Sequence, residues 1–264
     1  MMSRTLLLSD GLTVRALEAG QGAPVLLIHG VGLRAEVWAP QIAALSQTHR
    51  VIAVDMPGHG ESDPLPAGAR LPDYVAWGAR VIDALDAGPI AVAGHSMGSL
   101  IAAGLAVEHP ALVERVALIS GVHRRGDAAR AAVIARAHDI AAGRGSVEAP
   151  LARWFSAGEE ALRDKVAGWL SSVSPEGYAA AYRAFAEGDG VYADRLSQIA
   201  CPALVLTGAG DANSTAEMTR TMAAMMPQGR AVVIEGHRHM VGLTAPDAVN
   251  AAFLEFLAPQ EVGI

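Results

Sequence analysis

Short, continuous apolar runs alternate along this chain with longer segments of helical periodicity. A strand that is apolar on both faces needs cover on both faces, which is typical of a parallel sheet between two layers of helices. Strands that alternate with helical segments form βαβ units, in which each helix crosses from one strand to the next. The alternation therefore predicts an α/β protein with a mostly parallel sheet.

Eight strands and five connecting helices are predicted from these patterns. The chain opens with a predicted hairpin, whose strands Thr5–Leu8 and Leu12–Leu17 are separated by Ser9-Asp10-Gly11. Six further strands are predicted at Val25–His29, Val51–Asp55, Ile90–Gly94, Val116–Ser120, Ala203–Thr207 and Ala231–Ile234. Helices are predicted at Arg34–Ser46, Tyr74–Leu85, Ser96–Glu108, Ala216–Met226 and Pro246–Leu257. The spacing of Ser214 and Glu217 predicts a capping box at the start of the fourth of these helices.

The stretch from Arg124 to Leu196 departs from the alternation. It has no good strand run, and its Ala-rich helical pattern is broken by glycine and proline. A helical insertion between two strands of one sheet is the simplest account of this stretch. We therefore predict a core domain made of residues 1–123 and 197–264, and a helical cap made of residues 124–196.

The composition excludes several classes of protein. Hydrophobic residues make up 52% of the 264 residues and charged residues 18%, so the chain is not of the disordered class. The formal charge of −7 disfavours a nucleic-acid partner. No apolar run approaches the ~18 residues of a membrane span, and residues 1–10 lack the pattern of a secretory signal. We expect a cytoplasmic protein with no membrane or nucleic-acid partner.

The sharpest local signal is the run Gly94-His95-Ser96-Met97-Gly98. It lies between a predicted strand and a predicted helix, the strand-to-helix turn that a nucleophilic serine in a G-x-S-x-G motif requires. The glycines leave room at a strained turn, and the nearby helix N-terminus favours developing negative charge on the substrate. The run predicts Ser96 as a nucleophile, whereas His95 is expected to be structural.

A serine nucleophile needs a base, and the base needs an acid to orient it. Both are expected after later strands, in the chain order serine, acid, histidine. Asp211 follows the predicted strand at 203–207, and His237 and His239 follow the strand at 231–234. Asp211 is therefore the predicted acid, and both histidines are candidates for the base.

Together these elements resemble the α/β-hydrolase superfamily over nearly the whole chain. His29-Gly30-Val31-Gly32 looks like the family's HGxG element, and the segment Asp55–Ser62 matches the loop pattern D-x-P-G-x-G-x-S. Within the superfamily, these motifs most resemble those of the small bacterial esterases, enol-lactonases and cofactor-free haloperoxidases. The resemblance implies an α/β-hydrolase fold: a mostly parallel eight-stranded sheet flanked by helices, with an inserted helical cap.

The resemblance also implies roles for particular residues. The backbone N–H groups of Val31 and Met97 would form the oxyanion hole. His239 is preferred to His237 as the base because Pro246 lies seven residues after it, as in the family pattern, although His237 follows a glycine and stays an alternative. The Asp55–Ser62 loop would brace the sheet end, and His29 would orient the oxyanion loop.

Substrate-binding residues are less clearly marked. The candidates are Trp38, at the family's usual aromatic position, His123, and Trp154 in the cap. The run His123-Arg124-Arg125 has two interpretations. It is either a solvated basic turn, or it places His123 or an arginine at the pocket mouth, where it pairs with a substrate carboxylate.

The sequence therefore predicts a serine hydrolase that acts through an acyl-enzyme on a small ester, lactone or amide. A lyase or C–C bond hydrolase on the same triad, or a ligand receptor with a slow triad, remain as alternatives. No metal-ligand spacing or dinucleotide fingerprint is found in the sequence, so no metal or cofactor is expected. The expected partner is a small-molecule substrate, and the oligomeric state is open, with a homodimer among the alternatives.

Overall fold

Eight strands form one sheet in the order β1-β2-β4-β3-β5-β6-β7-β8 in the computed structural model, which describes residues 1–258. Residues 259–264, with which the predicted core domain ends, lie outside the described residues. The strands are β1 (Met2–Leu7), β2 (Thr13–Ala19), β3 (Pro24–Ile28), β4 (Arg50–Val54), β5 (Ile90–His95), β6 (Val113–Ile119), β7 (Ala203–Gly208) and β8 (Gly229–Ile234). β2 is antiparallel to its neighbours β1 and β4, and every other pairing is parallel. The predicted fold class is confirmed.

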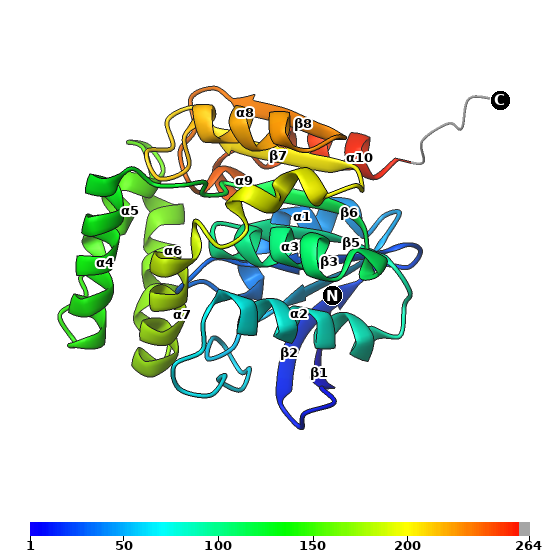
Figure 1. Ribbon diagram of the computed structural model, residues 1–264, viewed down its shortest axis with the longest axis horizontal. Coiled ribbons are helices and arrows are strands. Elements are labelled where there is room, and N and C mark those ends of the chain that lie inside the picture. The colour runs from blue at the N-terminus through cyan, green and yellow to red at the C-terminus, as the bar shows by residue number, and fades with distance from the viewer. Residues whose placement is uncertain (259–264) are drawn as a thin grey trace.

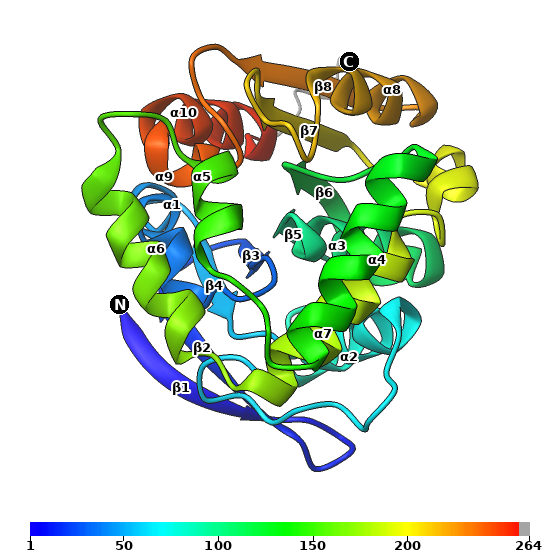
Figure 2. The same ribbon diagram turned by 90° about the vertical axis from the view of Figure 1, so that its left-hand side faces the viewer.

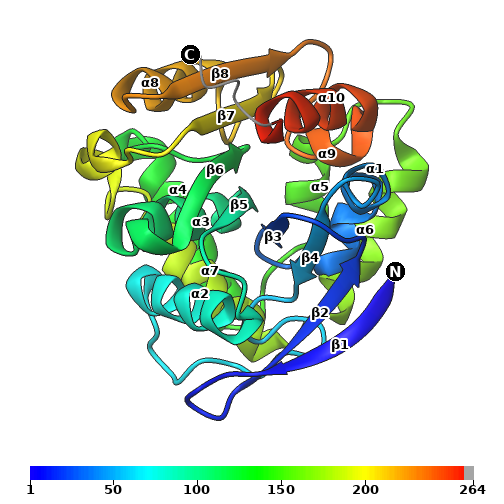
Figure 3. The ribbon, with the colours of Figure 1, turned by 90° about the vertical axis from the view of Figure 1, so that its right-hand side faces the viewer.

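Helices cover both faces of the sheet (Figure 3). One face carries α1 (Ala39–Leu45) and α10 (Pro246–Leu257), and the other carries α2 (Leu71–Leu85), α3 (Met97–Glu108) and α8 (Ala216–Met225). Successive side chains of a central strand enter opposite cores, because side chains alternate across a strand. In β3, Leu26 and Ile28 enter one core while Val25 and Leu27 enter the other. This two-sided burial explains why the strands are apolar at consecutive positions.

Four helices inserted between β6 and β7 form the cap, on the left of Figure 1. They are α4 (Asp127–Ala141), α5 (Glu148–Trp154), α6 (Glu160–Ser172) and α7 (Pro175–Gly188), and the 3-10 helix η3 (Ala193–Gln198) leads back to the sheet. α4 packs on α7 and α5 packs on α6. Figure 2, which faces the cap, shows these two pairs on either side of the ends of β3, β5 and β6.

The structure differs from the prediction at several helix starts, and α2 begins at Leu71, three residues before the predicted Tyr74, with Pro72 in its first turn. The helix predicted at Arg34–Ser46 is divided into the 3-10 helix η1 (Ala35–Trp38) and α1, because Pro40 lies in the first turn of α1, where its missing N–H costs nothing. The capping box predicted from Ser214 is wrong. Thr215 is the N-cap of α8 and accepts from Met218 N at 3.1 Å, whereas the Ser214 hydroxyl donates to the Ser120 carbonyl.

Two short elements complete the described chain. They are the 3-10 helix η2 (Pro110–Leu112), before β6, and α9 (Val241–Thr244), which precedes α10. Across residues 1–258, every helix is too short or too polar to traverse a lipid bilayer.

Candidate active site

Ser96 occupies a strained turn between β5 and α3. Its backbone has φ 54° and ψ −114°, a conformation that residues other than glycine rarely adopt. The amide of Ser96 donates to the Ile119 carbonyl on the neighbouring strand at 2.9 Å, which fixes the turn to the sheet. Strained residues of this kind persist where the surrounding structure over-determines them, and they cluster at functional sites.

The glycines on either side of Ser96 allow this turn to pack closely. A Cβ atom on Gly94 would lie 1.9 Å from the Gly98 carbonyl oxygen, and one on Gly98 would lie 2.1 Å from the Ile28 carbonyl oxygen. Neither backbone carbonyl can move aside without breaking the sheet or the helix start. The G-x-S-x-G pattern is therefore a packing requirement of the strand-to-helix turn.

Asp211 and His239 meet at the same end of the sheet, after β7 and β8. His239 Nδ1 lies 2.7 Å from Asp211 Oδ2, and both side chains are buried. A hydrogen bond from Nδ1 to a carboxylate places the proton on Nδ1 and leaves Nε2 as the proton acceptor. Asp211 Oδ1 also accepts from the amides of Asn213 and Ser214, at 2.8 and 3.0 Å.

These contacts keep Asp211 ionised. Burial by itself raises the pKa of a carboxyl group, but the charge and hydrogen bond of His239, with the two amide donors, outweigh it. The net result is that the pKa of Asp211 is lowered from its ordinary value. Asp211 is therefore available as a negatively charged acceptor that orients the His239 ring.

His237, the alternative base, lies elsewhere. Its Nδ1 is 3.0 Å from the Thr244 hydroxyl, and its side chain is 28% exposed, against 3% for His239. The structure thus brings His239, and not His237, to Asp211. In an extended chain residues i and i+2 point to the same side, so the different neighbours of these two histidines reflect the turn that begins at His239.

The backbone of His239 is held from two sides. Its carbonyl accepts from His95 Nε2 at 3.0 Å and from the Ser120 hydroxyl at 3.1 Å. Burial, and to a lesser degree the neighbouring His239, lowers the pKa of His95 to about 3, so His95 is neutral at physiological pH. His95 therefore acts on the position of His239, in agreement with the structural role expected for it.

The loop after β3 carries the predicted oxyanion donor Val31, and α3 begins at the other one, Met97. No side chain caps α3, and of the amides in its first turn Ser99 N donates to the carbonyl of the N-cap residue Ser96 at 3.0 Å. The β3 loop is fixed by two neutral histidines: His29 Nε2 accepts from Met56 N, and His59 Nε2 accepts from Gly32 N, each at 2.9 Å. Burial lowers the pKa of His29 to about 4 and that of His59 to about 3.

The Asp55–Ser62 loop braces the same region. Asp55 is fully buried, accepts from Ala35 N at 2.7 Å, and pairs with Arg15 at 2.9 Å. None of these groups is among those that line the cavity beside Ser96. The loop thus holds the β3 loop in place, as expected from the sequence.

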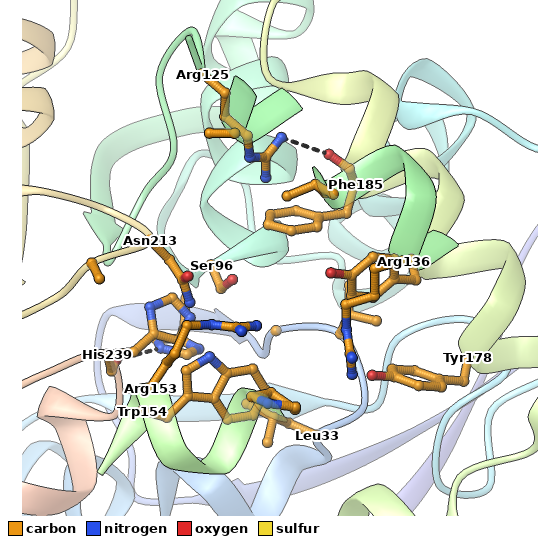
Figure 4. A pocket seen from close by; sticks show the side chains of 18 of the residues that line it. Leu33, Ser96, Arg125, Arg136, Arg153, Trp154, Tyr178, Phe185, Asn213 and His239 are labelled. Atoms are coloured by element: carbon orange, nitrogen blue, oxygen red, sulfur yellow. Dashed lines mark hydrogen bonds between the residues drawn. The ribbon is translucent and has the colours of Figure 1, made fainter. Parts of the chain in front are cut away.

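A cavity of about 140 Å³ lies between the sheet end and the cap, with Ser96 and His239 in its wall (Figure 4). No hydrogen bond joins the Ser96 hydroxyl to His239 among residues 1–258, and such bonds are often longer before substrate binds. The cap side of the wall is made by residues of α4, α5 and α7, which include Arg136, Arg153, Trp154, Tyr178, Tyr182 and Phe185. Val31 and Arg125 also line it.

Of the three predicted substrate-binding residues, only Trp154 lines this cavity. Trp38 is 2% exposed and packs edge-on against His95 and Phe253, within the core beneath the site. His123 faces a separate, smaller space between α3 and η3. The expectation for these two residues is therefore corrected: Trp38 is held in the core by its aromatic neighbours, and the turn after β6 directs Arg125, not His123, to the cavity.

Arg136 and Arg153 were missed by sequence reasoning. They belong to different cap helices, and neither lies in a recognisable motif. Arg125 belongs to the basic run for which a carboxylate-pairing role was one interpretation. The position of an arginine relative to Ser96 depends on how the cap helices pack on the sheet, which helical periodicity does not specify.

Comparisons with known proteins agree with this geometry. Residues 25–252 match the family model described as Alpha/beta hydrolase family. An esterase from Thermogutta terrifontis, solved with malate bound, has a TM-score of 0.88 and 27% identity, covering 97% of this chain and 98% of that one. The enol-lactonase from Burkholderia xenovorans LB400 has a TM-score of 0.87 and 26% identity, covering 96% and 99%.

A much closer sequence relative comes from Acinetobacter baylyi. It is named (E)-2-((N-methylformamido)methylene)succinate hydrolase, and it is 52% identical over 259 residues, which cover 97% of this chain and 98% of the relative. The similarity thus extends through the cap as well as the core. With the family match over residues 25–252 and a Ser-Asp-His constellation at the sheet end, it shows that this chain is a hydrolase and belongs to the alpha/beta hydrolase family.

Proposed function

We propose that the chain is a serine hydrolase in which Ser96 is the nucleophile, His239 the base and Asp211 the acid that orients the base. One observation carries the proposal: the buried 2.7 Å hydrogen bond of Asp211 to His239 ends in the same cavity wall as the strained Ser96. Nucleophile, base and orienting acid thus gather at one end of the sheet, where ligands bind in open α/β folds.

In the first half of the reaction, Ser96 Oγ attacks the substrate carbonyl carbon while His239 Nε2 takes the hydroxyl proton. Asp211 stabilises the resulting imidazolium without itself becoming protonated. The carbonyl oxygen becomes an oxyanion, which accepts hydrogen bonds from the amides of Met97 and Val31. Each such donor is worth ~3–4 kcal/mol in the transition state.

Collapse of the tetrahedral intermediate breaks the bond to the leaving group. His239 gives its proton to the departing nitrogen or oxygen, and the acyl group stays on Ser96 as an ester. In the second half, His239 takes a proton from water, the resulting hydroxide attacks the acyl carbon, and Ser96 recovers its proton from the imidazole. The products are a carboxylic acid and an amine or alcohol.

The bond that the chain hydrolyses is proposed to be an amide in a small derivative of succinate. The relative from Acinetobacter baylyi carries such a substrate in its name, and its 52% identity covers nearly the whole of both chains. In that compound a formamide nitrogen is joined to succinate through a carbon that is double-bonded to it, as the descriptor (E) requires, so hydrolysis of the amide releases formate and an enamine of the succinate. The malate bound to the esterase from Thermogutta terrifontis is likewise a four-carbon dicarboxylate.

Two measurements test this proposal. Intact mass after reaction with a fluorophosphonate should show one added group, which peptide mapping should place on Ser96 and which the variant Ser96→Ala should lack. Wild-type protein given (E)-2-((N-methylformamido)methylene)succinate should release formate. In Ser96→Ala the rate of formate release should be lower by a factor of at least ~10³.

Two results would count against it. A label on another residue would overturn the role of Ser96. Substrate loss without formate would exclude amide hydrolysis and favour cleavage of another bond by the same residues.

A further inference from the structure

The active-site cavity has the opposite charge from the chain as a whole. The chain has a formal charge of −7, yet the cavity is lined by Arg125, Arg136 and Arg153 and, within residues 1–258, by no aspartate or glutamate. A cleft with one sign of charge and apolar walls focuses the electric field and concentrates ligands of the other sign. Neutral esters would gain nothing from this arrangement, whereas anionic substrates would.

Arg125 is buried, and part of its guanidinium has no partner. The side chain is 5% exposed, lies 4.3 Å over the Phe185 ring, and its Nη1 donates to the Phe185 carbonyl at 3.3 Å. Its Nη2 is buried without a hydrogen-bond partner among the described residues. A buried donor left unsatisfied is destabilising, more so when it is charged. A ligand oxygen in the cavity would satisfy it.

The neighbouring carboxylate does not neutralise this charge. The Asp189 side chain is fully buried. Its Oδ1 lies 3.3 Å from Arg125 Nη1 and 3.0 Å from Arg130 Nη2. One carboxylate is therefore shared by two guanidinium groups, so the cluster of Arg125, Arg130 and Asp189 has a net charge of about +1. Asp189 also accepts from Arg125 N at 2.6 Å, so it fixes the start of the cap as well as the side chain.

Arg136 and Arg153 carry free charge on the cap side. No carboxylate of residues 1–258 lies within 4.0 Å of either guanidinium, although the other cavity arginine and most surface arginines are paired. Arg136 donates to the Ser146 carbonyl at 2.8 Å and lies 5.5 Å from the Tyr182 ring. In Figure 4 the Arg153 guanidinium extends across the cavity beside Ser96 and His239, with Arg136 approaching next to Tyr178 and Arg125 on the far side of Phe185.

From this arrangement we propose that the cavity binds a dicarboxylate at two separate positions. Arg125 Nη2 binds one carboxylate, and Arg153 with Arg136 binds the other, so that the substrate is held from two sides with its reacting carbonyl at Ser96. Guanidinium groups suit this task because they stay charged and present parallel donors to both oxygens of a carboxylate. The assignment of the reacting carbonyl rests on the proposed function, whereas the binding of the two carboxylates does not.

The test is a binding measurement that needs no turnover. Isothermal titration calorimetry on the wild-type protein compares succinate with butyrate, in which a methyl group replaces one carboxylate. Succinate should bind at least tenfold more tightly than butyrate. Arg125→Gln and Arg153→Gln should each weaken succinate binding about tenfold or more, toward the affinity for butyrate. Equal affinities for the two acids would overturn the proposal.

Matched variants separate binding from folding. Arg130→Lys keeps the positive charge that shares Asp189 and alters a side chain that does not line the cavity, so it should leave succinate binding within twofold of wild type. If Arg130→Lys weakens binding as much as Arg125→Gln, Arg125 acts through the Asp189 cluster, and its assignment fails. Should Arg125→Gln not fold, the exposed Arg153 decides the question alone, with Arg183→Gln on α7 as its surface control.

Fluorophosphonate labelling of Ser96 keeps the two proposals distinguishable. Labelling with no preference for succinate would overturn the dicarboxylate site and leave the serine hydrolase intact. Preference for succinate without labelling would do the reverse.

Discussion

The indole of Trp154 lies stacked on the imidazole of His239, with ring centroids 5.4 Å apart and planes inclined by 29°. Trp154 ends the cap helix α5, whereas His239 belongs to the core loop after β8. The adjacent Arg238 strengthens this contact, because its Nη1 donates to the carbonyls of Ala152 and Phe155 at 3.2 and 3.0 Å. The cap and the proposed base are therefore positioned by each other.

Replacing Trp154 should change the choice of substrate. The indole forms part of the cavity wall, so Trp154→Ala opens space for a larger acyl group. We expect the ratio of kcat/KM for p-nitrophenyl butyrate to that for p-nitrophenyl acetate to rise about fivefold or more, as pocket changes of this size do. The measurement is steady-state kinetics on both esters, together with the melting temperature.

Trp169→Ala is the control for this change. Trp169 is a partly buried tryptophan of the same cap, on α6, which packs on the core but does not line the cavity. Its loss should lower the melting temperature and leave the ratio unchanged. An unchanged ratio in Trp154→Ala would mean that Trp154 only holds the cap to the core.

The two histidines should differ sharply in their kinetic effect. His239→Ala removes the group that Asp211 orients, and we expect kcat to fall by about 10⁴-fold or more, as in other triads. Asp211→Asn should lower kcat by about 10⁴-fold, because the imidazole then loses the partner that selects its tautomer. His237→Ala loses contacts to Thr244 and Glu159, neither of which involves Ser96 or Asp211, so less than a tenfold change is expected. The reverse order of the two histidine variants would move the base to His237.

The glycine at the start of α3 should not tolerate a methyl group. The Cβ of Gly98→Ala would lie 2.1 Å from the Ile28 carbonyl oxygen, so β3 or α3 must shift, and the free energy of unfolding should fall by about 3 kcal/mol or more. Gly168 is a helical glycine of α6 with nothing within 4 Å of such a Cβ. Gly168→Ala should therefore raise the free energy of unfolding by about 0.5–1 kcal/mol. Urea unfolding of both variants tests the pair, and equal effects would contradict this account.

Acid should destabilise the fold through three buried histidines. Burial lowers the pKa of His29 to about 4, and those of His59 and His95 to about 3, from an ordinary value of 6.5. Below pH 6.5 the unfolded chain therefore binds more protons than the folded one, and the free energy of unfolding falls as the pH is lowered toward 4. The slope should approach ~1.4 kcal/mol per pH unit for each histidine.

Urea titrations between pH 7 and 4.5 measure this slope. His59→Gln should reduce it by at most about one third, because it removes one of the three most strongly shifted histidines, while burial also lowers the pKa values of His49 and His123. His138→Gln, on the exposed side of α4, should leave it unchanged. A free energy of unfolding that stays constant between pH 7 and 5 would contradict neutral burial of these histidines.

The sequence by itself determined the sheet, the chain order of its strands and the position of Ser96. These features depend on local rules. Apolar runs indicate strands buried on both faces, and Gly94 and Gly98 indicate a turn in which no larger residue fits at those two positions. Asp211 was found in the same way, because an acid after a late strand has only a few residues of loop in which to lie. Each of these signals is complete within about ten residues of chain.

Only the tertiary structure decided which groups meet across those elements. His237 and His239 differ by two positions, and the choice between them depends on which side of the loop faces Asp211. Ser214 and Thr215 are both suitable caps, and the choice depends on the Ser120 carbonyl from another strand. Arg125, Arg136 and Arg153 come from the end of one strand and from two helices, and they converge only because the cap packs over the sheet. Convergence of this kind arises from side-chain packing between distant segments, which no local pattern encodes.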